Sequence, residues 1–159
     1  MRYTVEISQE DYIAANYFAL RRRILWISVI SVLVLVFLAV IHRRDIFAWI
    51  FGAIELLMIW CIGYFLFLPW YFKRIYKQYK VINKPCEYEF TEYSFDRYSE
   101  YGNTTIPWGV FHKWRENKKV FLVYATSNLY YLIPKRIFNT VEEEQSLRDI
   151  LTKALGAAR

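Results

Sequence analysis

Two apolar runs, residues 24–41 (ILWISVISVLVLVFLAVI) and residues 46–72 (IFAWIFGAIELLMIWCIGYFLFLPWYF), decide the fold of this 159-residue chain. A helix over the first run, rising 1.5 Å per residue, spans about 27 Å, close to the hydrocarbon thickness of a membrane. A helix over the second run would be about 40 Å long. We expect it to tilt or to end at the interface, where Pro69 and the aromatic residues after it fit. The sequence therefore predicts a transmembrane helical hairpin over residues 24–72.

Two alternatives for these runs fit less well. A cleaved signal peptide would show a small-residue cleavage site after the first run, and a second apolar run follows instead. A soluble domain of this size cannot surround two fully apolar helices. Membrane spans are therefore the expected identity of both runs.

Lysine and arginine residues lie mostly at the outer ends of the predicted hairpin. Only Arg43 and Arg44 lie between the two runs, whereas eight flank them: Arg21, Arg22, Arg23, Lys73, Arg74, Lys77, Lys80 and Lys84. Because such residues stay in the cytoplasm, we expect both termini on that side. Residues 73–84 should form a basic juxtamembrane helix that attracts anionic lipid by about 1 kcal/mol per basic residue. The alternative is that these residues only fix the topology.

One acidic residue interrupts the second run. Glu55 lies near its middle, where a charged carboxylate is costly in lipid. Counting the same number of residues from the hairpin tip along each helix places Glu55 opposite Ser31, with Ser28 one turn away. This position predicts a hydrogen bond between Glu55 and Ser31 that joins the two helices. An ion or proton site built on Glu55 is the alternative, although one acid and two hydroxyls make a poor pathway.

The remaining sequence predicts an α+β domain. Residues 3–7 alternate as a strand, and Ser8 with Asp11 predicts a capping box for a helix over residues 9–23 that continues into the first run. Thr140 with Glu143 begins a C-terminal helix that ends near Gly156. Six more strands are expected over residues 86–91, 93–99, 104–108, 110–115, 120–125 and 129–133. They imply an antiparallel sheet or partly open barrel capped by a helix, the order of a pleckstrin-homology-like (PH-like) domain.

The sequence contains no recognisable catalytic motif. His42 and His112 fall on opposite sides of the predicted membrane, Cys61 lies within an apolar run, and Cys86 has no neighbouring base. HExxH, GxSxG, P-loop and GxGxxG patterns are all missing. The net charge of +6 fits an anionic membrane face better than nucleic acid, because the aromatic residues fall at buried strand positions. We expect no enzyme, cofactor, metal or nucleic-acid partner.

Four segments carry a family resemblance: Ile106-Pro107-Trp108, residues 111–114 (FHKW), residues 121–124 (FLVY) and residues 132–138 (LIPKRIF). Their order, followed by a helix with an acidic start, resembles the YcxB-like family of bacterial membrane proteins, and the layout is similar over the whole chain. The resemblance implies a PH-like domain over residues 85–159 and a bacterial inner-membrane location. It also implies that the strand over residues 3–7 joins the domain sheet, so that the hairpin interrupts the fold. It implies no catalytic or ligand-binding residues.

Three functions follow as hypotheses. The first is a membrane-anchored cytoplasmic PH-like binding or scaffold module that contacts a protein partner, the anionic membrane surface or both; a homo-oligomer is compatible with it. Its candidate contact residues in the juxtamembrane segment are Lys73, Arg74, Lys77, Lys80 and Lys84. Those in the domain are Arg115, Lys118, Lys119, Lys135 and Arg136, for which a solvated hairpin tip is the alternative. The second is an inner-membrane immunity protein that neutralises a cognate toxin. The third is a small transport or sensing component that uses Glu55.

Overall fold

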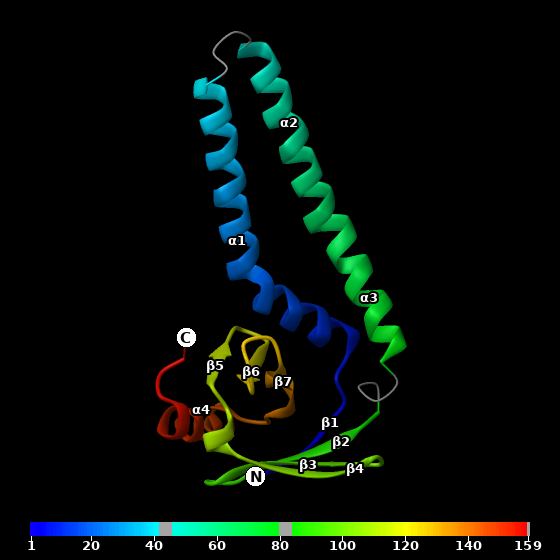
Figure 1. The fold of residues 1–159 in the computed structure, drawn as a ribbon. Helices are drawn as coiled ribbons and strands as arrows, with labels where there is room; N and C mark the ends of the chain where they lie inside the picture. Colours follow the sequence, from blue (N-terminus) through cyan, green and yellow to red (C-terminus); the bar gives the residue numbers. More distant parts are fainter. Residues whose placement is uncertain (42–45, 80–83, 159) are drawn as a thin grey trace. The chain divides into compact units, whose positions relative to one another are not determined.

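The computed structural model describes residues 1–41, 46–79 and 84–158 (Figure 1). The chain divides into two compact units. A helical unit comprises Asn16–Ile75, and a domain of strands and helices combines Met1–Ala15 with Tyr76–Arg159. The second unit is therefore built from both ends of the chain.

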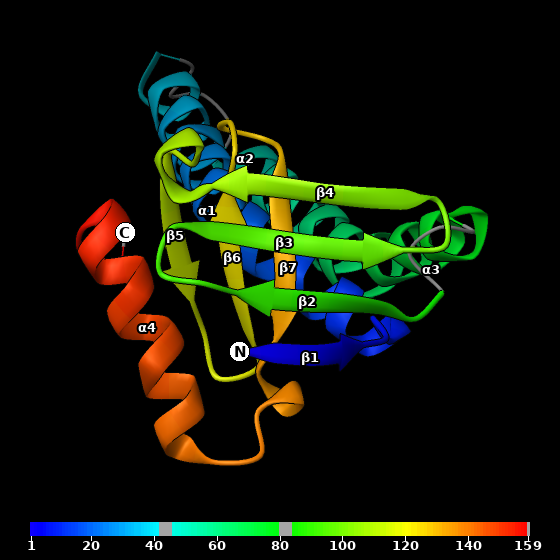
Figure 2. The ribbon, with the colours of Figure 1, turned by 90° about the horizontal axis from the view of Figure 1, so that it is seen from below.

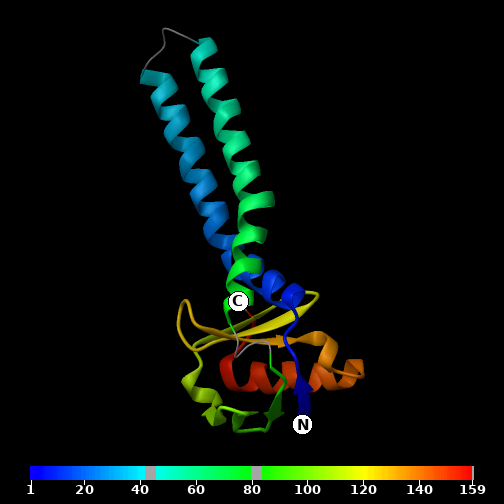
Figure 3. The same ribbon diagram turned by 90° about the vertical axis from the view of Figure 1, so that its right-hand side faces the viewer.

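Helix α1 (Gln9–Ile41) begins in the domain and continues into the helical unit. The predicted capping box starts it: Asp11 N–H donates to Ser8 Oγ, and Ser8 N–H donates to the Asp11 carboxylate, both at 3.1 Å. Helix α2 (Ile46–Ile62) runs antiparallel to it (Figures 1 and 3). The helices Gln9–Ile41 and Trp49–Gln78 are long and apolar enough to cross a membrane.

A π-helical turn, η1 (Gly63–Phe67), joins α2 to α3 (Leu68–Gln78). The Leu68 N–H bonds to the Gly63 carbonyl, five residues back, instead of four. Pro69 explains the widening, because proline has no N–H to donate and its ring would clash with the carbonyl of Phe65 in a regular helix. The helical run continues past this point and α3 ends at Gln78, inside the basic helix predicted over residues 73–84; residues 80–83 of that prediction lie outside the described residues.

The domain contains a four-stranded antiparallel sheet in the order β1-β2-β3-β4. Its strands are β1 (Arg2–Val5), β2 (Cys86–Phe90), β3 (Ser94–Ser99) and β4 (Gly102–Pro107). Strand β1 pairs with β2 from Arg2 opposite Glu89 to Val5 opposite Cys86. This pairing confirms that the N-terminal strand joins a sheet whose other strands follow the helices.

A second antiparallel sheet has three strands, β5 (Lys113–Glu116), β6 (Val120–Tyr124) and β7 (Tyr130–Pro134). Its strands cross those of the first sheet, and helix α4 (Val141–Leu155) lies beside β5 (Figure 2). Crossed sheets meet through their inner faces. The described strands thus form two separate sheets and no closed barrel.

Aromatic side chains fill the space between the sheets. Phe95 is almost fully buried, with its ring centroid 5.0 Å from that of Tyr88, 5.6 Å from Phe90 and 5.3 Å from Tyr131. Helix α4 closes the core with Leu147 and Leu151, which are completely buried. Burial of each leucine contributes about 1.5–3 kcal/mol.

The strand predicted over residues 110–115 begins later than expected. Residues Trp108–Val110 form a 3-10 turn, η2, and β5 starts only at Lys113. The indole of Trp108 is buried and donates to the Thr91 carbonyl at 3.0 Å, while Phe111 N–H donates to the Trp108 carbonyl at 3.0 Å. The 3-10 turn that carries the anchored Trp108 indole includes Val110, the first residue of the predicted strand, so β5 starts later.

Candidate functional site

Basic and aromatic residues gather where the apolar part of the helical unit ends. Arg21, Arg22 and Arg23 are exposed on α1, as are Lys73 and Arg74 on α3. Trp70 and Tyr71 lie just before these lysine and arginine residues, and the Arg74 guanidinium lies 5.6 Å from the Trp70 ring centroid. We call these seven residues the collar. Aromatic rings and long basic side chains are the residue types that occupy the headgroup level of a membrane.

The helical surface next to the collar is apolar and uncovered. Large side chains are exposed along both helices; Phe37 is 64 % exposed on α1, and Phe51 is 66 % exposed on α2. A soluble monomer rarely exposes a continuous apolar surface of this kind. The helical unit therefore presents an uncharged surface bordered by cationic groups.

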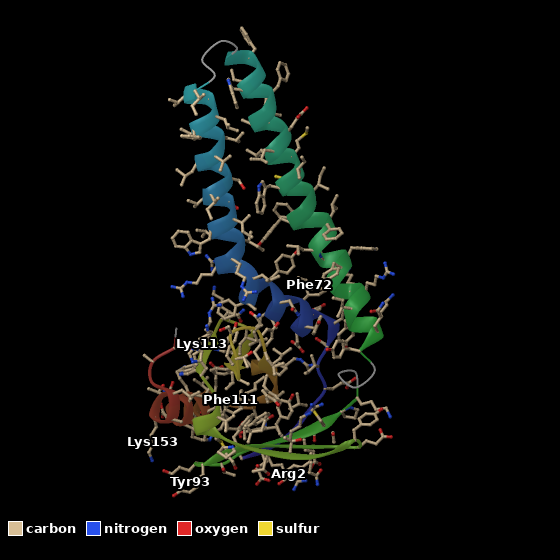
Figure 4. The ribbon with its side chains drawn as sticks, viewed as in Figure 1. Arg2, Phe72, Tyr93, Phe111, Lys113 and Lys153 are labelled. Atoms are coloured by element: carbon tan, nitrogen blue, oxygen red, sulfur yellow. The ribbon has the colours of Figure 1, made fainter. Side chains whose placement is uncertain are left out.

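A tyrosine links the two helical segments beside the π-helical turn. Because Leu68 N–H bonds to Gly63 and Pro69 has no N–H, the carbonyl of Tyr64 has lost its regular helical donor. The Tyr17 hydroxyl of α1 donates to this carbonyl at 2.7 Å. The Tyr17 ring also packs edge-on against Tyr64 and against Phe72, at 5.3 and 5.8 Å between centroids (Phe72 is labelled in Figure 4).

Among the described residues, the two serines predicted to face Glu55 donate their hydroxyls within α1. Ser31 Oγ donates to the Ile27 carbonyl, and Ser28 Oγ donates to the Ile24 carbonyl, each at 2.9 Å. A serine within a helix can satisfy its hydroxyl on the carbonyl four residues earlier, and this local bond competes with any partner on another helix. Glu55 is exposed on α2.

The predicted juxtamembrane basic residues separate in the structure. Lys73, Arg74 and Lys77 share helix α3 and are exposed. Lys80 lies outside the described residues. Lys84 lies beyond the helix and pairs with Glu100 of the β3–β4 turn, which raises the pKa of the Lys84 ammonium.

Lys135 belongs to the interior of the domain. Its side chain is only 13 % exposed, and its Nζ lies 2.7 Å from the Glu116 carboxylate, 2.8 Å from Glu144 and 4.5 Å from the Phe121 ring centroid. Arg148 completes the network with bonds of 2.9 Å to Glu116 and 2.6 Å to Glu144. These charges join β5, α4 and the turn after β7, so we remove Lys135 from the candidate contact residues.

The carboxylates of this network have altered acidities. Hydrogen bonding from Arg148 lowers the pKa of Glu116, and hydrogen bonding from Lys135 lowers the pKa of Glu144. The same pairing with Glu116 raises the pKa of Arg148. Glu116, Glu144 and Arg148 therefore stay charged at neutral pH and hold one another in place.

Arg136 binds the start of α1. Its Nε and one terminal nitrogen donate to the buried Asp11 carboxylate at 3.0 and 2.8 Å, and the terminal nitrogen also donates to the Glu6 carbonyl. Asp11 therefore caps α1 and receives Arg136 at once. This arginine ties the turn after β7 to the connection between β1 and α1, although its side chain remains 54 % exposed.

The three other predicted contact residues lie near the β5–β6 turn. Lys118 and Lys119 are exposed, and Arg115 is half-buried on β5. The Asn117 side chain shapes the turn, accepting from the N–H groups of Lys119 and Val120, both at 2.8 Å. Lys118 and Lys119 thus remain exposed basic side chains of the domain.

Sequence reasoning gave no role to Tyr17 or Arg97. Tyr17 could not be singled out, because the carbonyl it serves becomes available only through the π-helical turn. Arg97 carried a readable signal. It alternates with Phe95 and Ser99 on one face of the strand, and the structure places it on the same sheet face as the buried Tyr88.

Comparison with known proteins supports the family resemblance for part of the chain. Residues 90–151 match the family model described as YcxB-like protein. The match covers β3 to β7 and most of α4. No curated protein and no solved structure gives a significant match to the chain.

Proposed function

We propose that this protein is a membrane-anchored cytoplasmic binding module. Its helical hairpin crosses a bacterial inner membrane, its collar contacts anionic headgroups, and both termini lie in the cytoplasm with a PH-like domain. The observation that carries this proposal is the exposed apolar surface of α1 and α2, bordered by the collar. Burying one large apolar side chain in lipid is worth about 1.5–3 kcal/mol, and this surface holds many of them.

Two features support the binding role of the domain. The four-stranded and three-stranded antiparallel sheets followed by a C-terminal helix support the proposal of a PH-like fold. The charged network around Lys135 stabilises the interior, while Lys118 and Lys119 stay at the surface. A folded domain with free basic groups, carried next to a membrane anchor, suits recognition of an anionic surface or partner.

Membrane insertion is tested by fractionating cells that express the full-length chain. We expect the chain to stay in the membrane pellet after an alkaline carbonate wash, and a variant lacking residues 24–72 to be released. Reporter fusions at Met1 and at Arg159 should both report the cytoplasm. Release of the full-length chain by carbonate, or reporters on opposite sides, would contradict the anchor.

Headgroup contact is tested separately, by native mass spectrometry of the purified full-length chain. We expect retained anionic phospholipid to decrease in the triple variant Lys73→Gln, Arg74→Gln, Lys77→Gln. The matched control is Arg2→Gln with Lys153→Gln, which removes exposed charge from the domain at residues outside the proposed contact set and leaves the helices unchanged. Equal retention by wild type and the α3 variant would reject a role for these residues in lipid contact.

A further inference from the structure

Arg97 of β3 occupies an unusual place for an arginine. It lies opposite Tyr88 of β2 on one side and opposite Thr104 of β4 on the other, on the sheet face that carries Phe95. This inner face holds the aromatic core. The side chain of Arg97 is half-buried, and its Nε is buried without a hydrogen-bond partner among the described residues.

Three other arginines of the domain show what Arg97 lacks. Arg2 pairs with Glu87, Arg136 with Asp11, and Arg148 with Glu116 and Glu144. In the described part of the chain no carboxylate pairs with Arg97. A buried donor left unsatisfied is strongly unfavourable, and in native proteins it points to a missing ion, ligand or water.

Acidic residues of the sheet lie on the face opposite Arg97. Glu87, Glu89 and Asp96 alternate with the core positions of β2 and β3. Side chains at neighbouring strand positions point to opposite faces, so these carboxylates are kept away from the guanidinium. The inner face next to Arg97 therefore carries none of these three carboxylates.

Two residues that carry hydroxyl groups, Tyr88 and Thr104, occupy the positions paired with Arg97 on the same face. Tyr88 is 3 % exposed, and burial raises the pKa of its phenol above the usual value, so the phenol remains a hydrogen-bond donor at neutral pH. Thr104 lies across from Arg97 on the edge strand β4 and is exposed. The position is thus closed by core residues on the Tyr88 side and open to solvent at the β4 edge.

We propose that Arg97 is the centre of an oxyanion-binding site that takes a phosphate group, with the hydroxyls of Tyr88 and Thr104 as additional donors. A guanidinium binds phosphate through two parallel N–H groups, and a tetrahedral oxyanion accepts further bonds from other directions. The phosphate can belong to a soluble phosphomonoester or to a lipid headgroup, since the recognition chemistry is the same. This site goes beyond the proposed anchor and does not depend on it.

The test is a titration of the full-length protein in detergent micelles with inorganic phosphate, followed by the arginine Nε–H resonances. One resonance, assigned to Arg97 by its loss in Arg97→Gln, should shift and saturate. Arg97→Gln should lower phosphate affinity at least tenfold, and Tyr88→Phe, which removes one hydroxyl from the core, should lower it severalfold. Arg2→Gln is the matched control, because Arg2 lies on the outer face of the same sheet (Figure 4), and it should leave the affinity within twofold.

Further measurements identify where the phosphate group comes from and distinguish failure of this site from failure of the membrane anchor. Nanodiscs containing phosphatidic acid, without added phosphate, should shift the Arg97 resonance if the ligand is a lipid headgroup and leave it unchanged if the ligand is soluble. The site is overturned if inorganic phosphate gives no saturable shift, if Arg97→Gln binds as tightly as wild type, or if acetate at equal ionic strength gives the same shift. Each result is independent of carbonate extraction, so it can fail while the membrane anchor stands.

Discussion

Tyr17 shows how one hydroxyl can compensate for a proline in a neighbouring helical segment. Pro69 deprives the preceding turn of a backbone donor, and the Tyr17 hydroxyl supplies a donor to the Tyr64 carbonyl at 2.7 Å. We predict that Tyr17→Phe destabilises the helical unit by about 1 kcal/mol, the scale of a hydrogen bond between helices in membranes. Thermal unfolding of the purified full-length chain, followed by circular dichroism, measures the change.

The control for this prediction is Tyr71→Phe. Tyr71 lies on α3 and makes ring contacts with Phe67 and Phe72, and its hydroxyl has no partner among the described residues. Its loss should leave the unfolding temperature nearly unchanged. Equal effects of the two substitutions would show that the Tyr17 hydroxyl does not act through the Tyr64 carbonyl.

Glu116 gives the domain a pH dependence whose sign follows from its pairing. Its pKa is lowered in the folded state by hydrogen bonds from Arg148, so its contribution is complete above the ordinary carboxylate pKa and is lost as pH falls through the lowered value. We predict that Glu116→Gln destabilises the domain by about 1–3 kcal/mol at pH 7, because Lys135 and Arg148 lose one of the two carboxylates that they share. The difference from wild type should shrink below about pH 4.

Urea unfolding of wild type and Glu116→Gln at a series of pH values measures this difference. Glu100→Gln is the control, since Glu100 forms an exposed pair with Lys84 and should have a much smaller effect. A Glu116→Gln effect that stays constant from pH 7 to pH 3 would mean that the carboxylate charge is not what stabilises the network.

At the scale of elements, Gly156 shows where a helix end depends on backbone freedom. It ends α4 with φ of +79°, and its carbonyl accepts from the Trp114 indole at 2.8 Å. We predict that Gly156→Ala destabilises the domain by about 1 kcal/mol, because only glycine adopts positive φ without a steric penalty. Gly109→Ala is the control, as Gly109 has no positive φ and open space around it. The unfolding temperatures of Gly156→Ala and Gly109→Ala measure the difference. Equal unfolding temperatures would show that the positive φ of Gly156 does not contribute to stability.

Local signals in the sequence predicted most elements of the domain. The capping box at Ser8 is confirmed. At Thr140 only half of the predicted box is found: Thr140 Oγ1 accepts from Glu143 N–H at 3.3 Å, but the Glu143 carboxylate accepts at 2.8 Å from the N–H of Asn139, the residue before the cap. The period of two in the strand predicted over residues 86–91 is also found, since Glu87 and Glu89 alternate with buried residues in β2. These features depend on residues a few positions apart, which a single sequence displays directly.

Features that depend on tertiary contacts were not predictable in the same way. The Lys135-Arg136 pair looked like a free basic patch, yet one residue pairs with Glu116 and the other with Asp11, distant in the sequence. The end of α3 at Gln78 was also missed, because the run after it kept a helical pattern of lysines. Arg97 is the intermediate case, since strand alternation shows its face but not the missing partner.

At the scale of the whole molecule, the domain is assembled from both ends of the chain. Met1 and Phe90 exchange backbone hydrogen bonds: the Met1 amino group donates to the Phe90 carbonyl at 2.8 Å, and Phe90 N–H donates to the Met1 carbonyl at 2.7 Å. Strand β1 therefore lies at a sheet edge whose partner strand is separated from it by both long helices. Closing so long a connection between β1 and β2 costs conformational entropy. The pairing of β1 with β2 must offset this free-energy cost.

Because β1 pairs within the domain sheet, we expect a substitution in β1 to destabilise the domain without affecting the helices. A substitution at Val5 tests this expectation. Val5 is completely buried on β1, whereas its neighbour Thr4 is exposed on the outer face opposite Glu87. We predict that Val5→Lys makes residues 86–158 sensitive to protease in the full-length chain, because an unpaired charge enters the core. Thr4→Lys introduces the same side chain on the outer face and should leave the domain resistant. Both variants should fractionate with membranes like wild type, since the apolar helices are unchanged. If Val5→Lys abolished membrane fractionation, or if its domain stayed as resistant as that of Thr4→Lys, the edge strand would not have the role that its pairing with β2 assigns to it.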